Sequence, residues 1–251
     1  MKRTLILLLS LCLITGALFA AGQGEESTAD RIVVATDATW PPMQFIDENR
    51  ELVGFDIDLM RLIAEKGGFE VEFQNTAWDG IFAGLATREY DAVISSVTIT
   101  EERRQTMDFS IPYINAGQVL IVRQNQSGVT TLNDLRGRSV GAQIGTTGSF
   151  EVQAVAGVEL RTYDELGLAI EDLANGRIDG VVADTPIAAD YVLQNENYRD
   201  RLQIVGEPFT EEFYGVAVRK GNTEVLERIN AGLQAVLDSG RIAELEEKWL
   251  R

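Results

Sequence analysis

Hydrophobic and polar positions along residues 31–94 follow strand and helix periods in turn. A β-branched run opens this part, and an apolar stripe with helical spacing follows it and ends at the glycine pair 67–68. The pattern predicts strands at 31–36, 69–73 and 90–94, and helices at 54–64 and 78–87. This β-α-β-α-β order is typical of an open, mostly parallel sheet covered by helices.

The same alternation resumes near Val119 and continues to the end of the chain. It predicts strands at 117–122, 138–142, 178–182 and 213–218, and helices at 147–156, 164–175, 184–194, 222–238 and 241–249. The chain shows no convincing internal sequence repeat. A mature length of about 220 residues suits two lobes rather than one.

The N-terminus has the pattern of a secretory signal. Lys2 and Arg3 precede an apolar run at 5–21, and small and polar residues follow at once. We expect residues 1–22 to be removed by cleavage near Ala20 to Gly22, leaving a polar tether at 23–30. A retained membrane anchor is the alternative, but the run is short for a span. The sole cysteine, Cys12, lies within this run, so the mature chain would contain neither a thiol nor a disulfide.

Composition and charge narrow the possible functions. The chain is 45% hydrophobic with a formal charge of −17, which becomes −19 once Lys2 and Arg3 are lost. An acidic surface of this kind repels phosphate backbones, so we expect no nucleic-acid partner. The sequence contains no histidine, which excludes histidine-based catalytic triads and histidine-ligated metal sites. Nothing in it implies a cofactor or a metal.

The polar residues that could form a site fall just after predicted strands, where open α/β sheets bind their ligands. They form four clusters, at 36–42, 95–103, 145–149 and 181–186. In the second cluster, Thr100 is a plausible helix cap, and Arg103 would point back toward the strand end, where its guanidinium can bind a carboxylate. Alternatively, Arg103 pairs on the surface with a neighbouring glutamate. Arg104 points about 100° away around the helix.

The other clusters also allow two interpretations each. The turn at 145–149 offers free N–H groups to an anion or merely redirects the chain. Asp184 could bind an ammonium group or simply cap a helix. Trp40 and Trp78 could belong to the core or could stack on a flat or cationic group in a cleft. Together, an arginine, an aspartate and nearby hydroxyls complement the zwitterion of an α-amino acid.

The chain also resembles a known family, the exported amino-acid-binding proteins that serve ABC importers. It is most similar to those that bind lysine/arginine/ornithine, histidine or glutamine. The resemblance covers about 31–249. The motifs that carry it are Gly54-Phe55-Asp56-Ile57-Asp58-Leu59, the run from Asp91 to Arg103, Met107-Asp108-Phe109-Ser110 with Pro112-Tyr113, and Gly176-Arg177-Ile178-Asp179 before Asp184.

This resemblance implies an α/β, two-lobed periplasmic-binding-protein-like fold with two hinge crossover strands. Lobe one would contain 31–116 and 214–251, and lobe two 117–213. Arg103 would hold the ligand carboxylate with help from Thr98 and Thr147, and the ammonium would meet Ser96, Thr98 and Asp184. Asp37 and Ser95 would face the side chain, with Trp40 and Trp78 on its flat faces. Several relatives carry a disulfide-closed loop that this chain cannot form.

The resemblance further implies a monomer in the periplasm that delivers an L-amino acid to an ABC importer permease. Arginine is the favoured ligand, followed by lysine and glutamine, because Asp37 offers a carboxylate to a distal cation. The resemblance also extends to a cyclohexadienyl dehydratase that acts on prephenate or arogenate, and this activity is the alternative function. The two carboxylates expected in the cleft, Asp37 and Asp184, already have binding roles, so we expect no enzyme.

Overall fold

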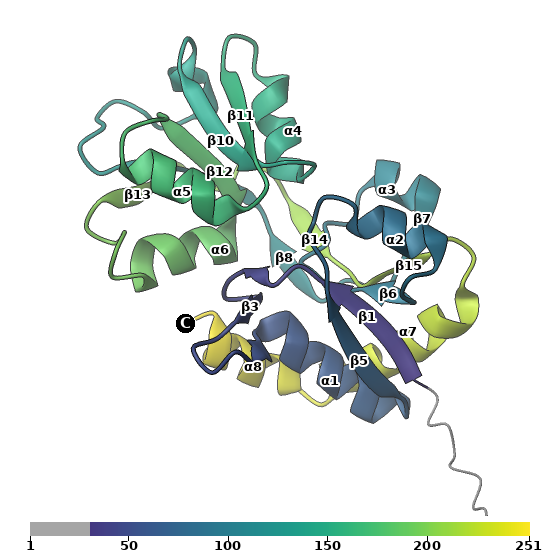
Figure 1. Ribbon diagram of the computed structural model, residues 1–251. Helices are drawn as coiled ribbons and strands as arrows, with labels where there is room; N and C mark the ends of the chain where they lie inside the picture. Colours follow the sequence, from purple (N-terminus) through teal and green to yellow (C-terminus); the bar gives the residue numbers. More distant parts are fainter. Residues whose placement is uncertain (1–30) are drawn as a thin grey trace, which may run out of the picture. The chain divides into compact units, whose positions relative to one another are not determined.

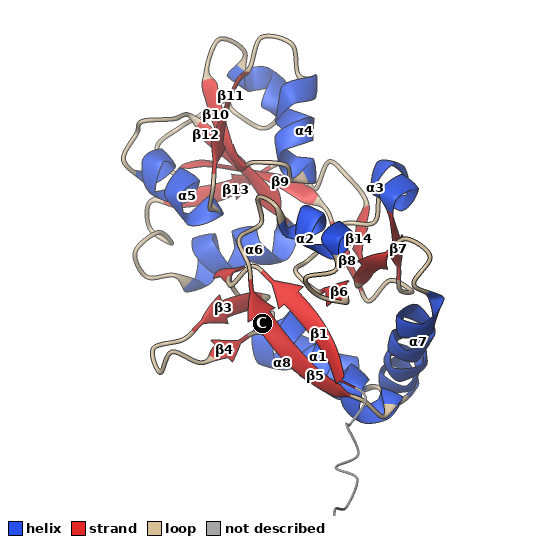
Figure 2. Ribbon diagram, turned by 45° about the vertical axis from the view of Figure 1, so that its right-hand side comes forward, coloured by secondary structure: helices blue, strands red, loops and turns tan. Residues whose placement is uncertain are grey.

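The computed structural model describes residues 31–251 (Figure 1). The predicted signal peptide (1–22) and tether (23–30) lie outside the described residues. Two five-stranded sheets with helices beside them form the described chain, which confirms the α/β class (Figure 2).

The first sheet is mixed rather than wholly parallel. Its strand order is β5 (Glu70–Asn75), β1 (Arg31–Thr36), β6 (Ala92–Val93), β15 (Ala217–Arg219) and β7 (Met107–Phe109). Strands β1 and β6 run parallel, with Val34 opposite Ala92, whereas β15 is antiparallel to both of its neighbours. The helices that accompany this sheet are α1 (Phe55–Gly67), α2 (Ile81–Thr87), α3 (Glu101–Thr106), α7 (Thr223–Asp238) and α8 (Arg241–Trp249). Among them, α1 packs against α7 (Figure 2).

The second sheet lies in the middle of the sequence. Its order is β11 (Glu159–Tyr163), β10 (Ser139–Gln143), β12 (Gly180–Asp184), β9 (Gln118–Arg123) and β13 (Leu202–Val205). The central strand β12 is parallel to β10 and antiparallel to β9. The helical segments of this part are α4 (Thr147–Ala154), α5 (Leu166–Ala174), α6 (Thr185–Ala189), the 3₁₀ turn Leu132–Leu135 and the π-helix Asp190–Gln194.

Two short strands join these parts of the chain. Strand β8 (Ile114–Ala116) leads into β9, and β14 (Glu212–Tyr214) leads back to β15; the two strands pair antiparallel, with Glu212 opposite Ala116. They correspond to the two crossover strands that the family resemblance implies. The lobe boundaries themselves stay a prediction.

Several predicted elements need correction. The predicted strand at 213–218 is two strands, because Tyr214 pairs with β8 whereas Ala217 pairs with the first sheet. The predicted helix at 184–194 begins after Asp184 and turns into a π-helix at Asp190. The sequence analysis also missed a three-stranded antiparallel sheet between β1 and α1, formed by β2 (Thr39–Trp40), β3 (Gln44–Ile46) and β4 (Leu52–Val53).

The motif that begins at Gly54 shows why its residue types are needed. Gly54 has φ 132°, and a Cβ there would lie 2.3 Å from the carbonyl oxygen of Met43, so only glycine fits this close approach. Helix α1 follows directly, buries the apolar stripe through Phe55 and Leu59, and ends at Gly68 in the left-handed conformation.

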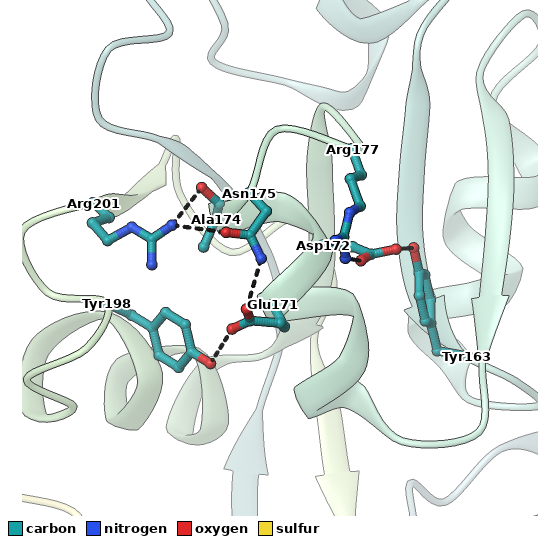
Figure 3. A network of polar contacts seen from close by, with 8 residues as sticks. All are labelled: Tyr163, Glu171, Asp172, Ala174, Asn175, Arg177, Tyr198 and Arg201. Atoms are coloured by element: carbon teal, nitrogen blue, oxygen red, sulfur yellow. Dashed lines mark hydrogen bonds and ion pairs between the residues drawn. The ribbon is translucent and has the colours of Figure 1, made fainter.

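The Gly176-Arg177-Ile178-Asp179 motif contributes to a polar network at the C-terminal end of α5 (Figure 3). Asp172 accepts hydrogen bonds from Arg177 at 2.8 Å and from the Tyr163 hydroxyl at 2.9 Å, and Glu171 accepts one from the Tyr198 hydroxyl at 3.0 Å. The network therefore ties α5 to β11 and to the segment before β13.

Candidate binding site

One cavity gathers residues from both sheets and their loops. It is lined by all nine predicted site residues, Asp37, Trp40, Trp78, Ser95, Ser96, Thr98, Arg103, Thr147 and Asp184, and by three that were not predicted, Gln44, Gln143 and Thr146. The predicted residues come from the four polar clusters and from Trp78, five stretches of sequence that the fold brings together. Their roles toward a ligand stay predictions.

Asp37 lies at one end of this cavity, directly after β1. Its carboxylate accepts hydrogen bonds from the Thr39 hydroxyl at 2.8 Å and from Nε2 of Gln143 at 3.2 Å. Burial raises the pKa of Asp37, although these donors partly offset the effect. Since Gln143 belongs to β10, this contact joins the first-sheet and second-sheet sides of the cavity.

Ser95 and Ser96 are held in place by hydrogen bonds to residues after β1, in β3 and in α1. Ser95 Oγ accepts hydrogen bonds from the Asp37 backbone N–H at 3.0 Å and from Nε2 of Gln44 at 3.1 Å. The Ser96 backbone N–H donates to Asp56 at 2.7 Å. Ser96 has a φ of 51°, in the left-handed region that few non-glycine residues adopt.

Arg103 occupies another side of the cavity. Thr100 caps α3, accepting the Arg103 backbone N–H at 3.1 Å, as predicted. The guanidinium turns back to the carbonyl oxygens of Thr98 (2.9 Å) and Gly145 (3.3 Å). These bonds use two of its five N–H donors. Burial lowers the pKa of Arg103, and the carboxylates of Asp184 and Glu212 oppose that shift. Arg104 is exposed instead, 3.9 Å from Glu101.

The two tryptophans of the cavity have different neighbours. The ring centroid of Trp78 lies 5.5 Å from the guanidinium carbon of Arg103, and the Phe82 ring lies 5.2 Å from the same carbon. The two rings meet edge to face, so they hold the guanidinium through cation–π contacts. Trp40 belongs to β2, is buried, and is part of a hydrophobic core cluster with residues of both five-stranded sheets.

Asp184 ends β12 and precedes α6, but its side chain makes no capping hydrogen bond. The carboxylate accepts a hydrogen bond from Nε2 of Gln118 at 2.9 Å. Burial raises its pKa to about 7, and the nearby charge of Glu212 adds to the shift. The capping interpretation of Asp184 therefore fails, and a buried carboxylate faces the cavity.

Glu212 is a further charged group beside the cavity that is not among the predicted site residues. It is 7% exposed and accepts hydrogen bonds from the hydroxyls of Thr98 (2.8 Å) and Thr147 (2.7 Å). Residues 212–214 alternate buried, exposed, buried, so the strand period within Glu212-Phe213-Tyr214 could have indicated an inward-facing carboxylate. The segment was assigned only a connecting role.

Within residues 31–251, no helix is long and apolar enough to cross a membrane. In the same range, no group of three or more acidic side chains is arranged to hold a metal ion.

A two-sheet α/β chain with one polar cavity lined from both sides agrees with the comparison to known families. Residues 32–251 match the family described as bacterial extracellular solute-binding proteins, family 3. The chain belongs to this family. Solute-binding proteins of this family are binding components of ABC transporters and not enzymes.

Relatives of this solute-binding protein cover nearly its whole length. The L-cystine-binding protein TcyJ of Escherichia coli K12 is 36% identical over 91% of this chain and 90% of its own. The ABC transporter arginine-binding protein 1 of the same strain is 35% identical over 94% and 98%. A solved structure of an ancestral arginine-binding protein bound to arginine is 45% identical, covers 88% of this chain and 98% of its own, and has a TM-score of 0.83. A solved structure of an ancestral arginine-binding protein bound to glutamine is 45% identical, covers 87% of this chain and 97% of its own, and has a TM-score of 0.82.

The dehydratase alternative finds no support in these relatives. One similar structure is related to the dehydratase: an ancestral amino-acid-binding protein described as a precursor of cyclohexadienyl dehydratase. It is 36% identical, covers 88% of this chain and 96% of its own, and has a TM-score of 0.81. It is itself a binding protein, so the expectation that this chain is not an enzyme is confirmed by its family.

Proposed function

We propose that this solute-binding protein captures a polar or basic L-amino acid, with arginine preferred over lysine and lysine over glutamine, and delivers it to an ABC permease. One observation carries the proposal: a single cavity is lined by Arg103, Asp184 and Asp37, and both carboxylates are buried. Three charged groups of this kind complement the carboxylate, the α-ammonium and the distal cation of arginine.

Each group has a chemical reason for its role. Arg103 keeps N–H donors for a ligand carboxylate, and buried charge-assisted hydrogen bonds of this type are strong. Asp184, as an anion, would meet the α-ammonium, with Ser96 nearby. Asp37 would accept from the ligand guanidinium in place of Gln143. Trp40 and Trp78 would then lie against the flat faces of the side chain.

Transport requires export and a change of shape. We infer that residues 1–22 direct the chain to the periplasm and are cleaved there, and that the mature protein acts as a monomer. Lobes built around the two sheets would close on the ligand about β8 and β14 and present a surface to the permease. The relatives that serve ABC importers support this route.

Isothermal titration calorimetry of the purified protein against the twenty amino acids and L-cystine tests the function. We expect one site per chain and the tightest binding for arginine. Cystine is included because TcyJ binds it. Tightest binding of leucine or glutamate, or no binding at all, would contradict the proposal.

A further inference from the structure

Glu212 lies at the junction of the two sides of the cavity. Its Oε2 accepts from Thr98, from Thr147 and, at 3.4 Å, from Nε2 of Gln118, and its Oε1 accepts from the Thr210 hydroxyl at 2.9 Å. Thr98 follows the first-sheet strand β6, whereas Thr147 opens α4 beside the second sheet. All four donors are neutral, so the carboxylate is held by oriented dipoles.

This arrangement fixes the direction in which the hydroxyl protons of Thr98 and Thr147 point. A hydroxyl has one proton and two lone pairs, and an ionised carboxylate can only accept. Thr98 and Thr147 therefore both direct their protons at Glu212. The two hydroxyl oxygens lie 3.5 Å apart, and both residues line the cavity with Asp184. What they can still offer to a ligand is lone pairs.

Lone pairs suit a cation and not an anion. The hydroxyl protons of Thr98 and Thr147 are already donated to Glu212, so they are not available to a ligand carboxylate. This part of the cavity would therefore meet the α-ammonium, and the carboxylate would be bound by Arg103. Gln118 supports this orientation of the Thr147 hydroxyl. Its Nε2 donates to the Thr147 oxygen at 3.2 Å, so the Thr147 proton must point elsewhere, and it also donates to Asp184 at 2.9 Å.

We propose that Glu212 is a positioning residue that turns the hydroxyls of Thr98 and Thr147 into acceptors and so makes the cavity select a ligand with an α-ammonium group. The inference rests on the proposed function and deepens it. A methionine at position 212 has a similar size but no carboxylate oxygen, so the hydroxyls of Thr98 and Thr147 would lose their acceptor and could turn their protons into the cavity.

The test compares L-arginine with 5-guanidinopentanoate, its analogue without the α-amino group, by calorimetry at pH 8. Glu212→Met should weaken arginine binding about ten- to a hundredfold and the analogue less than about threefold. Glu211→Met is the matched control, since it makes the same replacement at the exposed neighbouring residue, and it should change neither affinity. Melting temperatures without ligand confirm that each variant is folded.

A double-mutant cycle separates positioning from simple charge attraction. In a Thr98→Val background, Glu212→Met should lower the affinity for arginine several-fold less than in the wild type, because one of the two hydroxyls through which Glu212 acts is gone. Equal losses in the two backgrounds, or equal losses for arginine and the analogue, would overturn the proposal while leaving the proposed function standing. A wild type that binds no amino acid would overturn both.

Discussion

Asp56 holds the backbone of Ser96 across 40 residues of sequence. Oδ2 of this fully buried aspartate on α1 accepts the Ser96 N–H at 2.7 Å, at the point where φ is 51°. A non-glycine residue in this conformation costs about 1 to 3 kcal/mol, and such conformations persist only where the surroundings fix them. Asp56 therefore helps to place the loop that carries Ser95, Ser96 and Thr98.

This aspartate should make stability depend on pH. Burial raises the pKa of Asp56 to about 7 from a usual 3.8, so between these values the folded state binds a proton that the unfolded state lacks. The contribution of Asp56 to the free energy of unfolding is present below pH 4 and falls as pH rises toward 7, by at most about 1.4 kcal/mol per pH unit. In thermal unfolding between pH 5 and 8, Asp56→Asn should flatten this decline. The exposed control Asp200→Asn should follow the wild type, and parallel curves for wild type and Asp56→Asn would refute the assignment.

Arg103 and Arg104 provide a matched pair for the carboxylate contact. Arg103→Ala removes a half-buried guanidinium and should weaken arginine binding by roughly 2 to 5 kcal/mol, since the ligand carboxylate loses its partner. Arg104→Ala removes an exposed group that lies 3.9 Å from Glu101 and should change the affinity by less than about 0.5 kcal/mol. Calorimetry on both variants gives the comparison, and similar losses would show that Arg103 is not the carboxylate ligand.

Asp184 should make ligand binding depend on pH. Because burial raises its pKa to about 7 and an ammonium favours the ionised form, binding releases a proton when the free protein is protonated. Affinity should therefore increase with pH up to about 7, by at most about tenfold per pH unit, and level off above. Asp184→Asn should bind arginine much more weakly at pH 8, with a flatter pH profile.

The same variant separates binding from stability. Asp184 makes no side-chain capping bond, and burial disfavours its charged form, so Asp184→Asn should not lower the melting temperature of the free protein. A large fall in that temperature with unchanged affinity would mean that Asp184 serves the fold and not the ligand.

Asp37 should decide between ligands that differ in their distal group. Asp37→Asn replaces a charged hydrogen bond to a guanidinium by a neutral one, so it should weaken arginine by more than it weakens glutamine. Competition binding of the two ligands on wild type and variant measures the difference directly. Equal losses would place the side-chain contact elsewhere.

Long periodic elements were predictable from the sequence, and short irregular ones were not. The strand at Arg31–Thr36 and the helix at Arg241–Trp249 have their predicted bounds, because each has a full period of apolar positions. Strands of two residues, such as Leu52–Val53, have no period to detect. The cavity residues follow strand ends, which a sequence indicates well. Glu212 does not follow the end of a predicted strand. Its position beside the cavity depends on the pairing of β14 with β8, whose residues lie nearly 100 positions earlier in the sequence.

The placement of the tryptophans gives the protein an optical reporter of its own. Two of the three indoles, Trp40 and Trp78, line the cavity, and the second lies against a guanidinium whose field would shift its emission. The third, Trp249, donates to Asp58 at 2.9 Å near the C-terminus and would contribute a constant background. Fluorescence of a Trp249→Phe variant would therefore come from the site alone, so ligand exchange could be followed in real time without an attached dye.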